Sequence, residues 1–355
     1  MAAIAEKVKF AVLGYGHIGK RHAEMVFKNM EAILTAVIDT SENERSSSTL
    51  LDEVPFFYSL EDFLLDPIGA ATDVICIATP NGRHAENALT CLAAGKHVVI
   101  EKPIALNTPD AEKIISCAET VGKKVFAVMQ NRYSPPSRWI KELVSSGKMG
   151  QLYMVQLNCY WNRDTRYYKP GSWHGTKDLD GGTLFTQFSH FIDLMYWLFG
   201  DIKNISGKLR DNNHQELTDF EDSGFVNFEF SESGGMGCIS YSTSVWDKNL
   251  ESSIIVIAEN GSVKIGGQYM DKLEYCHVKD YHCPELQPTN EGNDYGTYKG
   301  SAANHHFVIQ NVVDVLKNRA PITTTAQEGK KIVEIIENIY STVKFNKKTT
   351  DNVYC

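Results

Sequence analysis

KFAVLGYGHIGKR, residues Lys9–Arg21, is an apolar run that breaks into the glycine pattern Gly14-Tyr15-Gly16-His17-Ile18-Gly19. This order is typical of a strand, a tight turn and the start of a helix. Gly14 can take backbone angles that a Cβ forbids, Gly16 leaves room for a pyrophosphate, and Gly19 lets the helix lie close to its strand. The N–H groups at the helix start, around His17, Ile18 and Gly19, then face phosphates. The pattern predicts a nucleotide pocket.

A second strand is predicted at Ile33–Ile38, and it ends on Asp39, twenty positions after Gly19. An acidic group at this spacing takes the ribose hydroxyls of NAD and repels a 2′-phosphate, which favours NAD over NADP. Arg45 weakens that preference, because a nearby arginine can accommodate NADP. The alternative is a structural glycine turn with Asp39 as a strand-end cap. The combination of motif, strand and spacing favours the cofactor site.

Composition limits the class of protein. At 355 residues with 43% hydrophobic content, the chain is long enough for two domains. The net charge of -9 and the lack of a basic run argue against a nucleic-acid partner. We expect no signal peptide and no membrane span, and hence a cytoplasmic protein. The eight scattered cysteines are interpreted as mostly buried thiols, because several lie inside apolar strand or helix patterns.

Strand and helix patterns alternate six times in the first part of the chain. The clearest segments are the strands Ala71–Ala78, Lys96–Ile100 and Lys124–Met129 and the helices Arg83–Ala94 and Thr108–Val121. This alternation predicts a doubly wound parallel sheet, in which ligands bind beyond the carboxyl ends of the strands. Three such ends carry polar residues, at Thr79–Asn81, Glu101–Pro103 and Gln130–Arg132.

The pattern changes after Lys148. Gln151–Trp161 and five segments between Ser223 and Tyr275 alternate apolar and polar residues, with turns between them, which predicts antiparallel strands. Amphipathic helices are predicted at Phe307–Leu316 and Ile332–Tyr340. We therefore predict an α/β protein in which residues 1–129 form an NAD-binding Rossmann domain. Residues 130–355 form a second domain with a large, mainly antiparallel sheet.

Lys102 is the first candidate catalytic residue. It follows a buried strand and precedes Pro103, which fixes the exit of the chain. Its ammonium group can hydrogen-bond a substrate hydroxyl or stabilise negative charge on the oxygen, and it can act as an acid or base if burial lowers its pKa. The alternative is a surface lysine paired with Glu101.

The second candidate lies in TLFTQFSHFIDLMYWLF, residues Thr183–Phe199, a stretch with glycines at both ends that predicts one helix. At about 100° per residue, the face opposite the apolar one carries Thr186, His190, Asp193 and Trp197. An imidazole suits proton removal from an alcohol, and Asp193 lies one turn away, where it can influence the ring. His190 is the predicted base, and a purely structural histidine is the alternative.

The loop Trp161–Pro170, WNRDTRYYKP, mixes basic and aromatic side chains, including Arg163, Arg166 and Tyr168. Guanidinium groups bind phosphates in a bidentate way and rings stack on a base, so the loop is a candidate site for a nucleotide-linked substrate. A solvated loop at a sheet edge is the alternative. Cys276-His277 and His282-Cys283 have the wrong spacing for a zinc finger, so no metal site is predicted. His305-His306, at a helix start, is predicted to be structural.

These motifs together resemble the Gfo/Idh/MocA family of NAD(P)-dependent sugar oxidoreductases. The resemblance covers essentially the whole chain, from GYGHIG through ATPNGRH, EKP and QNR to DGGTLFTQFSHFIDLMYWLFG. Within it, Gln130–Gly200 and Asn249–Gly267 look most like the bacterial UDP-N-acetyl-2-amino-2-deoxyglucuronate dehydrogenases, which oxidise the sugar at C3.

The resemblance implies that an open sheet in the second domain mediates a homodimer or homotetramer. It also implies catalysis by Lys102 and His190, NAD as the cofactor, and a nucleotide sugar of surface-polysaccharide biosynthesis as the substrate. Beyond the glycine motif and Asp39, the dinucleotide contacts that it implies are Thr79, Asn81, His84, Glu101, Lys102, Asn131 and Arg132. The candidate substrate contacts are the loop residues Arg163, Arg166 and Tyr168, together with Trp173, Thr186 and Asp193.

Two positions depart from the family pattern. Polyol-oxidising relatives carry an aspartate four positions before the histidine, where this chain has Thr186, so a His–Asp pair of that kind is absent. In Trp173-His174-Gly175, sugar-nucleotide relatives more usually have arginine in the middle. Two other functions stay open, since fold alone does not set the substrate. They are a free-sugar, polyol or sugar-phosphate dehydrogenase and a non-catalytic NAD-binding regulator.

Overall fold

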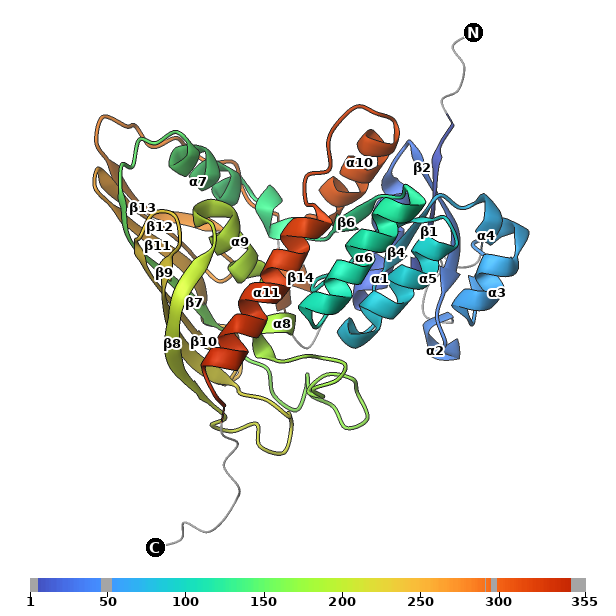
Figure 1. Ribbon diagram of the computed structural model, residues 1–355, viewed down its shortest axis with the longest axis horizontal. Coiled ribbons are helices and arrows are strands. Elements are labelled where there is room, and N and C mark those ends of the chain that lie inside the picture. The colour runs from blue at the N-terminus through green and yellow to red at the C-terminus, as the bar shows by residue number, and fades with distance from the viewer. Residues whose placement is uncertain (1–5, 46–52, 291, 295–298, 346–355) are drawn as a thin grey trace, which may run out of the picture. The chain divides into compact units, whose positions relative to one another are not determined.

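The computed structural model describes residues 6–45, 53–290, 292–294 and 299–345 (Figure 1). Its contacts divide the chain into two compact units. The first contains Met1–Met129 and Asn304–Val333, and the second contains Gln130–Ala303 and Glu334–Cys355. The first boundary between the units, after Met129, is at the same residue as the predicted end of the first domain. The return of Asn304–Val333 to the first unit differs from the expected single second domain of residues 130–355.

The first unit is built on a six-stranded parallel sheet, which confirms the predicted doubly wound architecture. Its strand order is β3-β2-β1-β4-β5-β6. All four residues of β4, VICI, are buried, as a strand covered on both faces requires. The strands are β1 (Val8–Leu13), β2 (Ala32–Ile38), β3 (Phe56–Phe57), β4 (Val74–Ile77), β5 (His97–Ile100) and β6 (Val125–Ala127).

Helices connect these strands. The predicted helix Thr108–Val121 is confirmed as α6: the Asn107 side chain accepts a hydrogen bond from the Asp110 N–H, and Gly122 ends the helix at a φ of 66°. The other helices of this unit are α1 (His17–Lys28), α2 (Glu42–Arg45), α3 (Leu60–Leu65), α4 (Pro67–Ala71), α5 (His84–Ala93) and α10 (His305–Leu316), with the 3₁₀ turn η2 (Asn81–Arg83).

The C-terminal segment completes the first unit. α10 lies against α1. The chain after it pairs with the edge strand β6, where the Ala127 N–H donates to the Thr324 carbonyl at 3.1 Å and Phe126 and Thr325 form an antiparallel bridge. α11 (Ala326–Thr342) begins at this point. These contacts cover a strand edge, and they explain why Asn304–Val333 belongs to the first unit.

The second unit contains a seven-stranded sheet of order β13-β12-β11-β7-β10-β9-β8. All neighbours pair antiparallel except β7 and β10, which are parallel, so the predicted mainly antiparallel sheet is confirmed. The strands are β7 (Leu152–Tyr160), β8 (Ile202–Arg210), β9 (Ser223–Phe230), β10 (Met236–Ser242), β11 (Glu251–Ala258), β12 (Gly261–Gly266) and β13 (Lys272–Val278). β14 (Gly292–Asp294) and β15 (Lys299–Ala302) form a separate pair.

The two faces of this sheet differ. Helices α7 (Pro135–Ser145) and α9 (Ser189–Phe199) lie on one side of it (Figure 1), where β7 buries Val155 and Leu157. On the other face Met154 is exposed, and so are its cross-strand partners Met236 and Ile257. Apolar side chains therefore reach the surface over several neighbouring strands.

The prediction of one continuous helix over Thr183–Phe199 is wrong. The segment forms α8 (Thr183–Thr186) and α9, separated at Gln187 and Phe188. The Thr186 hydroxyl donates to the Asp180 carboxylate, and the Gln187 side chain accepts from Arg163 Nε at 2.7 Å. These side chains bond to neighbouring loops, and hydrophobic periodicity carries no information about such contacts.

Most of the described cysteines carry free thiols, as expected, but one pair forms a disulfide that was not predicted. After β13 the chain turns back through an antiparallel bridge between Val278 and Tyr281, which brings the Cα atoms of Cys276 and Cys283 to 6.5 Å and forms a disulfide. Five other cysteines carry free thiols in the described part of the chain: Cys76, Cys91, Cys117, Cys159 and Cys238. None of the described helices combines the length and apolarity of a membrane span.

Candidate functional site

The glycine turn lies between β1 and α1, as predicted. Gly14 has a φ of 87°, and a Cβ there would lie 2.7 Å from the Ala78 carbonyl oxygen; a Cβ at Gly19 would lie 1.8 Å from the Gly14 oxygen. Both positions therefore require glycine. A Cβ at Gly16 would meet no heavy atom of the described residues within 4 Å, so this side of the turn is open. An open turn at the start of α1 fits the phosphates of a dinucleotide.

Asp39 is fastened beside this turn. The Tyr15 N–H donates to Asp39 Oδ2 at 2.6 Å, and the Ser41 N–H donates to Oδ1 at 2.8 Å. Since Tyr15 belongs to the glycine turn, the carboxylate has a defined position next to it. The arrangement fits a contact with ribose hydroxyls. The side chain of Arg45, at the end of α2, lies outside the described part of the structure.

The end of β4 is tied to the turn that follows β5. His84, the first residue of α5, is buried, and its ring nitrogens lie 2.8 Å from the Thr79 carbonyl oxygen and 2.7 Å from the Pro103 carbonyl oxygen. Burial lowers the pKa of His84, which favours a neutral ring that donates to one of the two carbonyls. Asn81 is also buried, in the short turn η2. His84 therefore lies between the two segments and, as a neutral ring, donates to one of them at a time.

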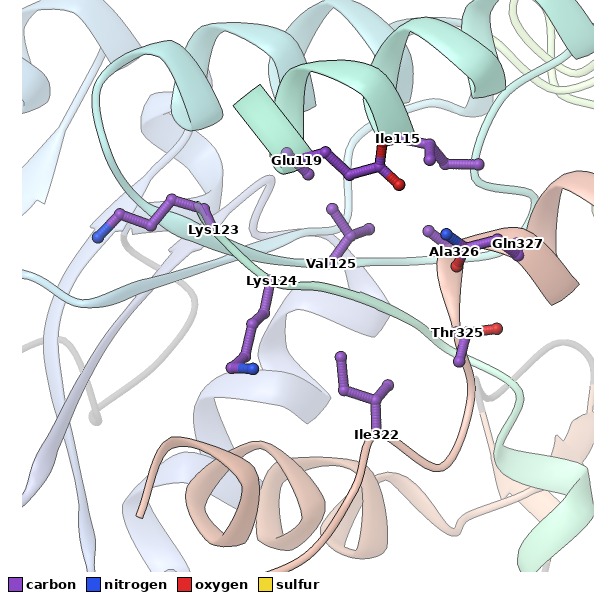
Figure 2. A pocket seen from close by; sticks show the side chains of 10 residues that line it. Ile115, Glu119, Lys123, Lys124, Val125, Ile322, Thr325, Ala326 and Gln327 are labelled. Carbon is purple, nitrogen blue, oxygen red and sulfur yellow. The ribbon is translucent and has the colours of Figure 1, made fainter. Parts of the chain in front are cut away.

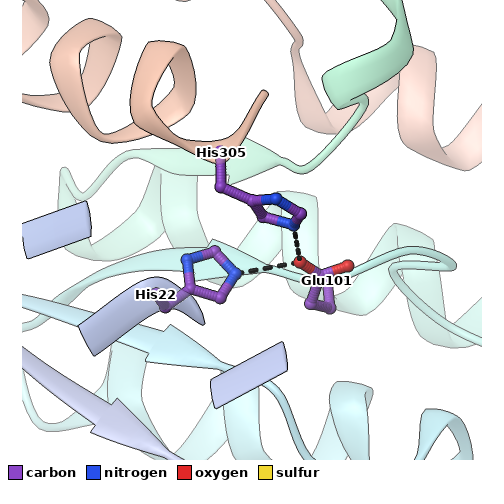
Figure 3. Close-up of side chains that lie close together, drawn as sticks. All are labelled: His22, Glu101 and His305. Atoms are coloured by element: carbon purple, nitrogen blue, oxygen red, sulfur yellow. Dashed lines mark hydrogen bonds and ion pairs between the residues drawn. The ribbon is translucent and has the colours of Figure 1, made fainter. Parts of the chain in front are cut away.

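Glu101, at the end of β5, is the centre of a buried cluster that the sequence did not predict (Figure 3). His22 Nε2 and His305 Nε2 lie 2.9 and 3.2 Å from Glu101 Oε1, and the Lys102 N–H donates to Oε2 at 3.2 Å. Burial opposes the charge on Glu101, but the hydrogen bonds with His22 and His305 and the positive charge on His22 outweigh it and hold the pKa of Glu101 well below its usual range. The carboxylate is therefore ionised.

Lys102 follows this carboxylate directly, and its peptide bond to Pro103 is cis. The ionised Glu101 and the His84 contact with Pro103 O constrain the backbone on both sides of Lys102. Lys102 belongs to the first unit, whereas His190 belongs to the second.

A hollow in the first unit lies beside the edge strand β6 (Figure 2). Its lining is mixed, with Ile115 and Val125 among apolar groups and Glu119, Lys123 and Lys124 among charged ones. Both lysines precede β6 in the chain, at the amino end of the strand. Because ligands of doubly wound sheets bind beyond the carboxyl ends, this hollow is not the dinucleotide site.

In the second unit, His190 lies in the first turn of α9 and is buried. The Gln130 side-chain nitrogen, from the 3₁₀ turn η3 (Gln130–Tyr133), lies 3.2 Å from His190 Nε2. An amide nitrogen only donates, so Nε2 is an acceptor and a neutral ring carries its proton on Nδ1. A lone pair at Nε2 is the form that a general base needs. The sequence motif QNR draws attention to Gln130, but no sequence pattern identifies His190 as its partner.

Asp193 forms a buried, bidentate ion pair with Arg132. Arg132 Nε lies 2.9 Å from Asp193 Oδ2, and Nη2 lies 2.6 Å from Oδ1. The side chains are only 2% and 1% exposed, so the pair is shielded from solvent. Sequence spacing predicted that Asp193 influences His190. In the structure both carboxylate oxygens of Asp193 accept from Arg132, which is 61 positions away. Asn131, between Gln130 and Arg132, is buried as well.

The loop after β7 is held by its own side chains. Arg163 is buried, donates to Gln187 and lies over the rings of Trp161 and Tyr167. Arg166 is more exposed and donates to both oxygens of Asp164, at 3.0 and 2.8 Å. Both arginines predicted to meet a phosphate therefore have acceptors within the protein. Of the remaining candidates, Tyr168 is buried beside Phe220, and Trp173 stacks on His174 at 3.9 Å.

The segment before His190 is held by a second buried glutamate. Tyr241 and Tyr340 hydroxyls each donate to Glu221 Oε1 at 2.8 Å, and Tyr340 accepts from the Leu184 N–H at 3.0 Å. Burial raises the pKa of Glu221 to about 8. A Cβ at Gly182 would lie 2.6 Å from the Tyr340 hydroxyl, so glycine at this position lets Tyr340 reach α8.

Two family models match most of the chain. The model described as "Oxidoreductase family, NAD-binding Rossmann fold" matches residues 8–129, and the model of the GFO/IDH/MocA C-terminal domain matches residues 137–264. The two matches follow each other in the order and at the places of the two sheets described above.

Similar proteins include enzymes of two kinds. The WlbA dehydrogenase of Chromobacterium violaceum, solved with NADH and UDP-GlcNAcA, is 27% identical with a TM-score of 0.85, over 96% of this chain and 94% of that one. The WlbA of Bordetella pertussis, solved with the same ligands, is 26% identical with a TM-score of 0.83, over 95% and 96%. The scyllo-inositol 2-dehydrogenase (NADP(+)) IolW of Bacillus subtilis is 24% identical over 94% and 92%. The chain belongs to the Gfo/Idh/MocA family of oxidoreductases.

Proposed function

We propose that this protein is an NAD-dependent dehydrogenase that oxidises a sugar-ring hydroxyl of a nucleotide sugar, at C3 of UDP-N-acetylglucosaminuronate, for the biosynthesis of surface polysaccharides. The observation that carries the proposal is the likeness, over nearly the whole chain, to two dehydrogenases solved with NADH and UDP-GlcNAcA, at 27% and 26% identity. Since NAD and nucleotide sugars are both cytoplasmic metabolites, the proposed location is the cytoplasm.

The residues of the first unit fit NAD. The open turn at Gly16 and the start of α1 would hold the pyrophosphate, and Asp39 would bind the adenosine ribose and repel a 2′-phosphate. Bound there, NAD supplies the acceptor for a hydride. The proposal therefore includes a lower KM for NAD than for NADP, and Asp39→Ala is expected to narrow that difference.

Lys102 and His190 are the proposed catalytic residues. His190 Nε2 would accept the proton of the sugar hydroxyl, and the Lys102 ammonium would hydrogen-bond the same oxygen and stabilise the negative charge that develops on it. The carbinol carbon loses a hydride, the oxygen loses a proton, and a ketone results. The Gln130 amide nitrogen lies 3.2 Å from His190 Nε2, and it would have to give up this hydrogen bond when Nε2 accepts the substrate proton.

The test compares NADH formation from a UDP-sugar uronate, free sugars and inositols. We expect turnover with the UDP-sugar, a loss of at least about 100-fold in kcat for Lys102→Met and His190→Gln, and nearly unchanged NAD binding. Lys124→Met changes an exposed lysine beside β6 and is the matched control. Undiminished turnover in Lys102→Met would overturn the catalytic assignment, and turnover of inositols alone would overturn the substrate.

A polyol dehydrogenase is the second candidate. The likeness to a scyllo-inositol 2-dehydrogenase extends over 94% of the chain. Arg163 has an acceptor in Gln187, and Arg166 has one in Asp164 of its own loop. Oxidation of an inositol in preference to a UDP-sugar would favour this function. NAD binding with no turnover of any of these substrates would favour a regulator.

The proposal includes a homodimer or homotetramer formed through the open face of the seven-stranded sheet. Met154, Met236 and Ile257 are exposed on neighbouring strands of that face, and burial of such apolar area favours association. Light scattering after size exclusion is expected to give a multiple of the 39.8 kDa chain mass. A concentration-independent monomer would contradict this part of the proposal.

A further inference from the structure

The Glu101 cluster joins three segments that are far apart in the sequence. His22 lies in α1, the helix that starts at the glycine turn. Glu101 directly follows β5, and His305 is the first residue of α10. Both histidines are fully buried, and Glu101 is 6% exposed. Figure 3 shows the two rings pointing at the same carboxylate oxygen. The other oxygen holds the backbone N–H of Lys102.

Two histidines and a glutamate whose ligand atoms lie within 4.8 Å of one another are also a possible metal-binding set. The charges and protons argue for hydrogen bonding instead. Burial lowers the pKa of His22, but the interactions with Cys76 and Glu101 outweigh burial and raise it to about 10, so a charged His22 faces an ionised Glu101. A protonated Nε2 has no lone pair for a metal.

The second histidine supports the same interpretation. Burial lowers the pKa of His305, so its ring is neutral and has one N–H. Its Nδ1 has no hydrogen-bond partner in the described part of the chain. A metal on Nε2 would force the proton onto Nδ1 and leave a buried donor unsatisfied, whereas a proton on Nε2 serves Glu101 and leaves only a lone pair at Nδ1. The charges of His22 and Glu101 cancel, and hydrogen bonds alone account for the contacts of both histidines with Glu101, so the cluster needs no metal.

We propose that His22 and His305 are positioning residues for Lys102, and that they act through Glu101. They hold the carboxylate in one orientation, and that carboxylate holds the backbone N–H of Lys102. Because His22 lies in the middle of α1, the same carboxylate links the helix that follows the glycine turn to the Lys102 turn. This inference rests on the proposed catalytic role of Lys102.

The test uses a matched pair of substitutions at His305. In His305→Gln the side-chain amide nitrogen takes the place of Nε2 and can still donate to Glu101, whereas in His305→Asn the amide is one carbon shorter and cannot reach. We expect His305→Asn to lower kcat by about 10- to 100-fold, since small misplacements of catalytic groups have effects of this size. NAD affinity should change by less than about threefold, and His305→Gln should recover most of the activity.

A second readout does not need turnover. Hydrogen exchange of the Lys102 amide reports its bond to Glu101, so exchange should be faster in His305→Asn and near the wild-type rate in His305→Gln. His306→Asn changes the exposed neighbouring histidine and should change neither readout. Melting temperatures show which variants are folded. If His305→Asn does not fold, His22→Gln against His22→Asn gives the same comparison on α1.

Three results would overturn the positioning role. One is wild-type kcat and wild-type Lys102 exchange in folded His305→Asn. The second is a His305→Gln variant no better than His305→Asn. The third is a stoichiometric metal in the purified protein whose removal by a chelator abolishes activity. If Lys102→Met retains full turnover, the proposed function fails, but the exchange experiment still decides whether the histidines position Lys102.

Discussion

Glu101 and Glu221 are both buried glutamates, one in each compact unit, and their pKa values shift in opposite directions. Burial raises the pKa of Glu221 to about 8, because the hydroxyls of Tyr241 and Tyr340 offset only part of the cost of a buried charge. The same cost acts on Glu101, but two imidazoles outweigh it and hold its pKa well below the usual range. The chemistry of the partners therefore decides whether a buried carboxyl keeps its proton.

The two units therefore hold their candidate catalytic segments in different ways. Glu101 is a charged anchor, bonded to the backbone of Lys102. Glu221 is a neutral anchor whose partner Tyr340 binds the N–H of Leu184 in α8, shortly before His190. The first anchor depends on electrostatic attraction, and the second depends on the carboxyl staying protonated. The two units should therefore respond differently to loss of charge and to pH.

The largest effect is expected for Glu101→Gln. The substitution keeps the shape of the side chain but removes the negative charge opposite His22, which leaves a buried cation without its counter-ion. We expect the free energy of unfolding at neutral pH to fall by roughly 3 kcal/mol, as measured by urea denaturation. The matched variant Glu221→Gln should not show this loss, because an amide replaces a carboxyl that is protonated in the fold and needs no proton uptake on folding at neutral pH. Equal losses in the two variants would show that Glu221 is also ionised.

The second-largest effect is expected in the pH dependence of stability, to which Glu221 and Glu101 contribute with opposite signs. The pKa of Glu221 rises from 4.5 to about 8 on folding, so its contribution is fully present below the unfolded value and is lost as pH rises through the folded value. Stability should fall by a few kcal/mol from about pH 5 to about pH 8, at about 1.4 kcal/mol per pKa unit. The lowered pKa of Glu101 has the opposite sign, so its contribution is lost in acid.

Denaturation curves across this pH range test the assignment. In Glu221→Gln the decline between about pH 5 and about pH 8 should be much smaller than in the wild type, while the loss of stability in acid remains. A decline of the same size in both proteins would mean that another group causes it. His84 and His305 do not account for it, because burial lowers their pKa values and such groups favour the fold as pH rises. His22, whose pKa is raised to about 10, adds a decline above about pH 6.5, and this part should remain in Glu221→Gln.

Local sequence patterns predicted the first unit well. The glycine turn needs a strand, a residue that can adopt a positive φ and a helix that packs closely on the strand. The segment Lys9–Arg21 encodes all three. The helix Thr108–Val121 carries its own start and stop signals in Asn107, Pro109 and Gly122. The position of Asp39 beside the glycine turn could be predicted because its distance from the glycines reflects the length of one helix and one strand. Short-range chemistry determines each of these features.

Long-range polar contacts could not be predicted from the same patterns. His305 meets Glu101 across 204 positions, and Gln130 meets His190 across 60. Periodicity placed Asp193 on the face of His190, but it cannot say that Arg132 pairs with it or that bonds from Thr186 and Gln187 divide the helix. The disulfide between Cys276 and Cys283 depends on a tight reversal that spacing alone does not reveal. Side-chain hydrogen bonds across the fold carry this information.

The smallest effect is expected within the Glu221 anchor. Tyr241→Phe removes one hydrogen bond to Glu221, whereas Tyr340→Phe removes that bond and also the acceptor of the Leu184 N–H. Each lost hydrogen bond contributes about 1 kcal/mol, so Tyr340→Phe should be the less stable variant by about that amount. Tyr153→Phe, on the exposed part of β7, is the control.

Both phenols lower the pKa of Glu221 by donating to it, so losing either should raise that pKa and move the decline in stability to higher pH. The shift is measurable in the same denaturation curves. A larger loss in Tyr241→Phe than in Tyr340→Phe would contradict the structure, because only Tyr340 joins the buried carboxyl to the backbone of α8. It would mean that α8 is held from the strand β10 rather than through α11, and that the neutral anchor does not extend to the segment before His190.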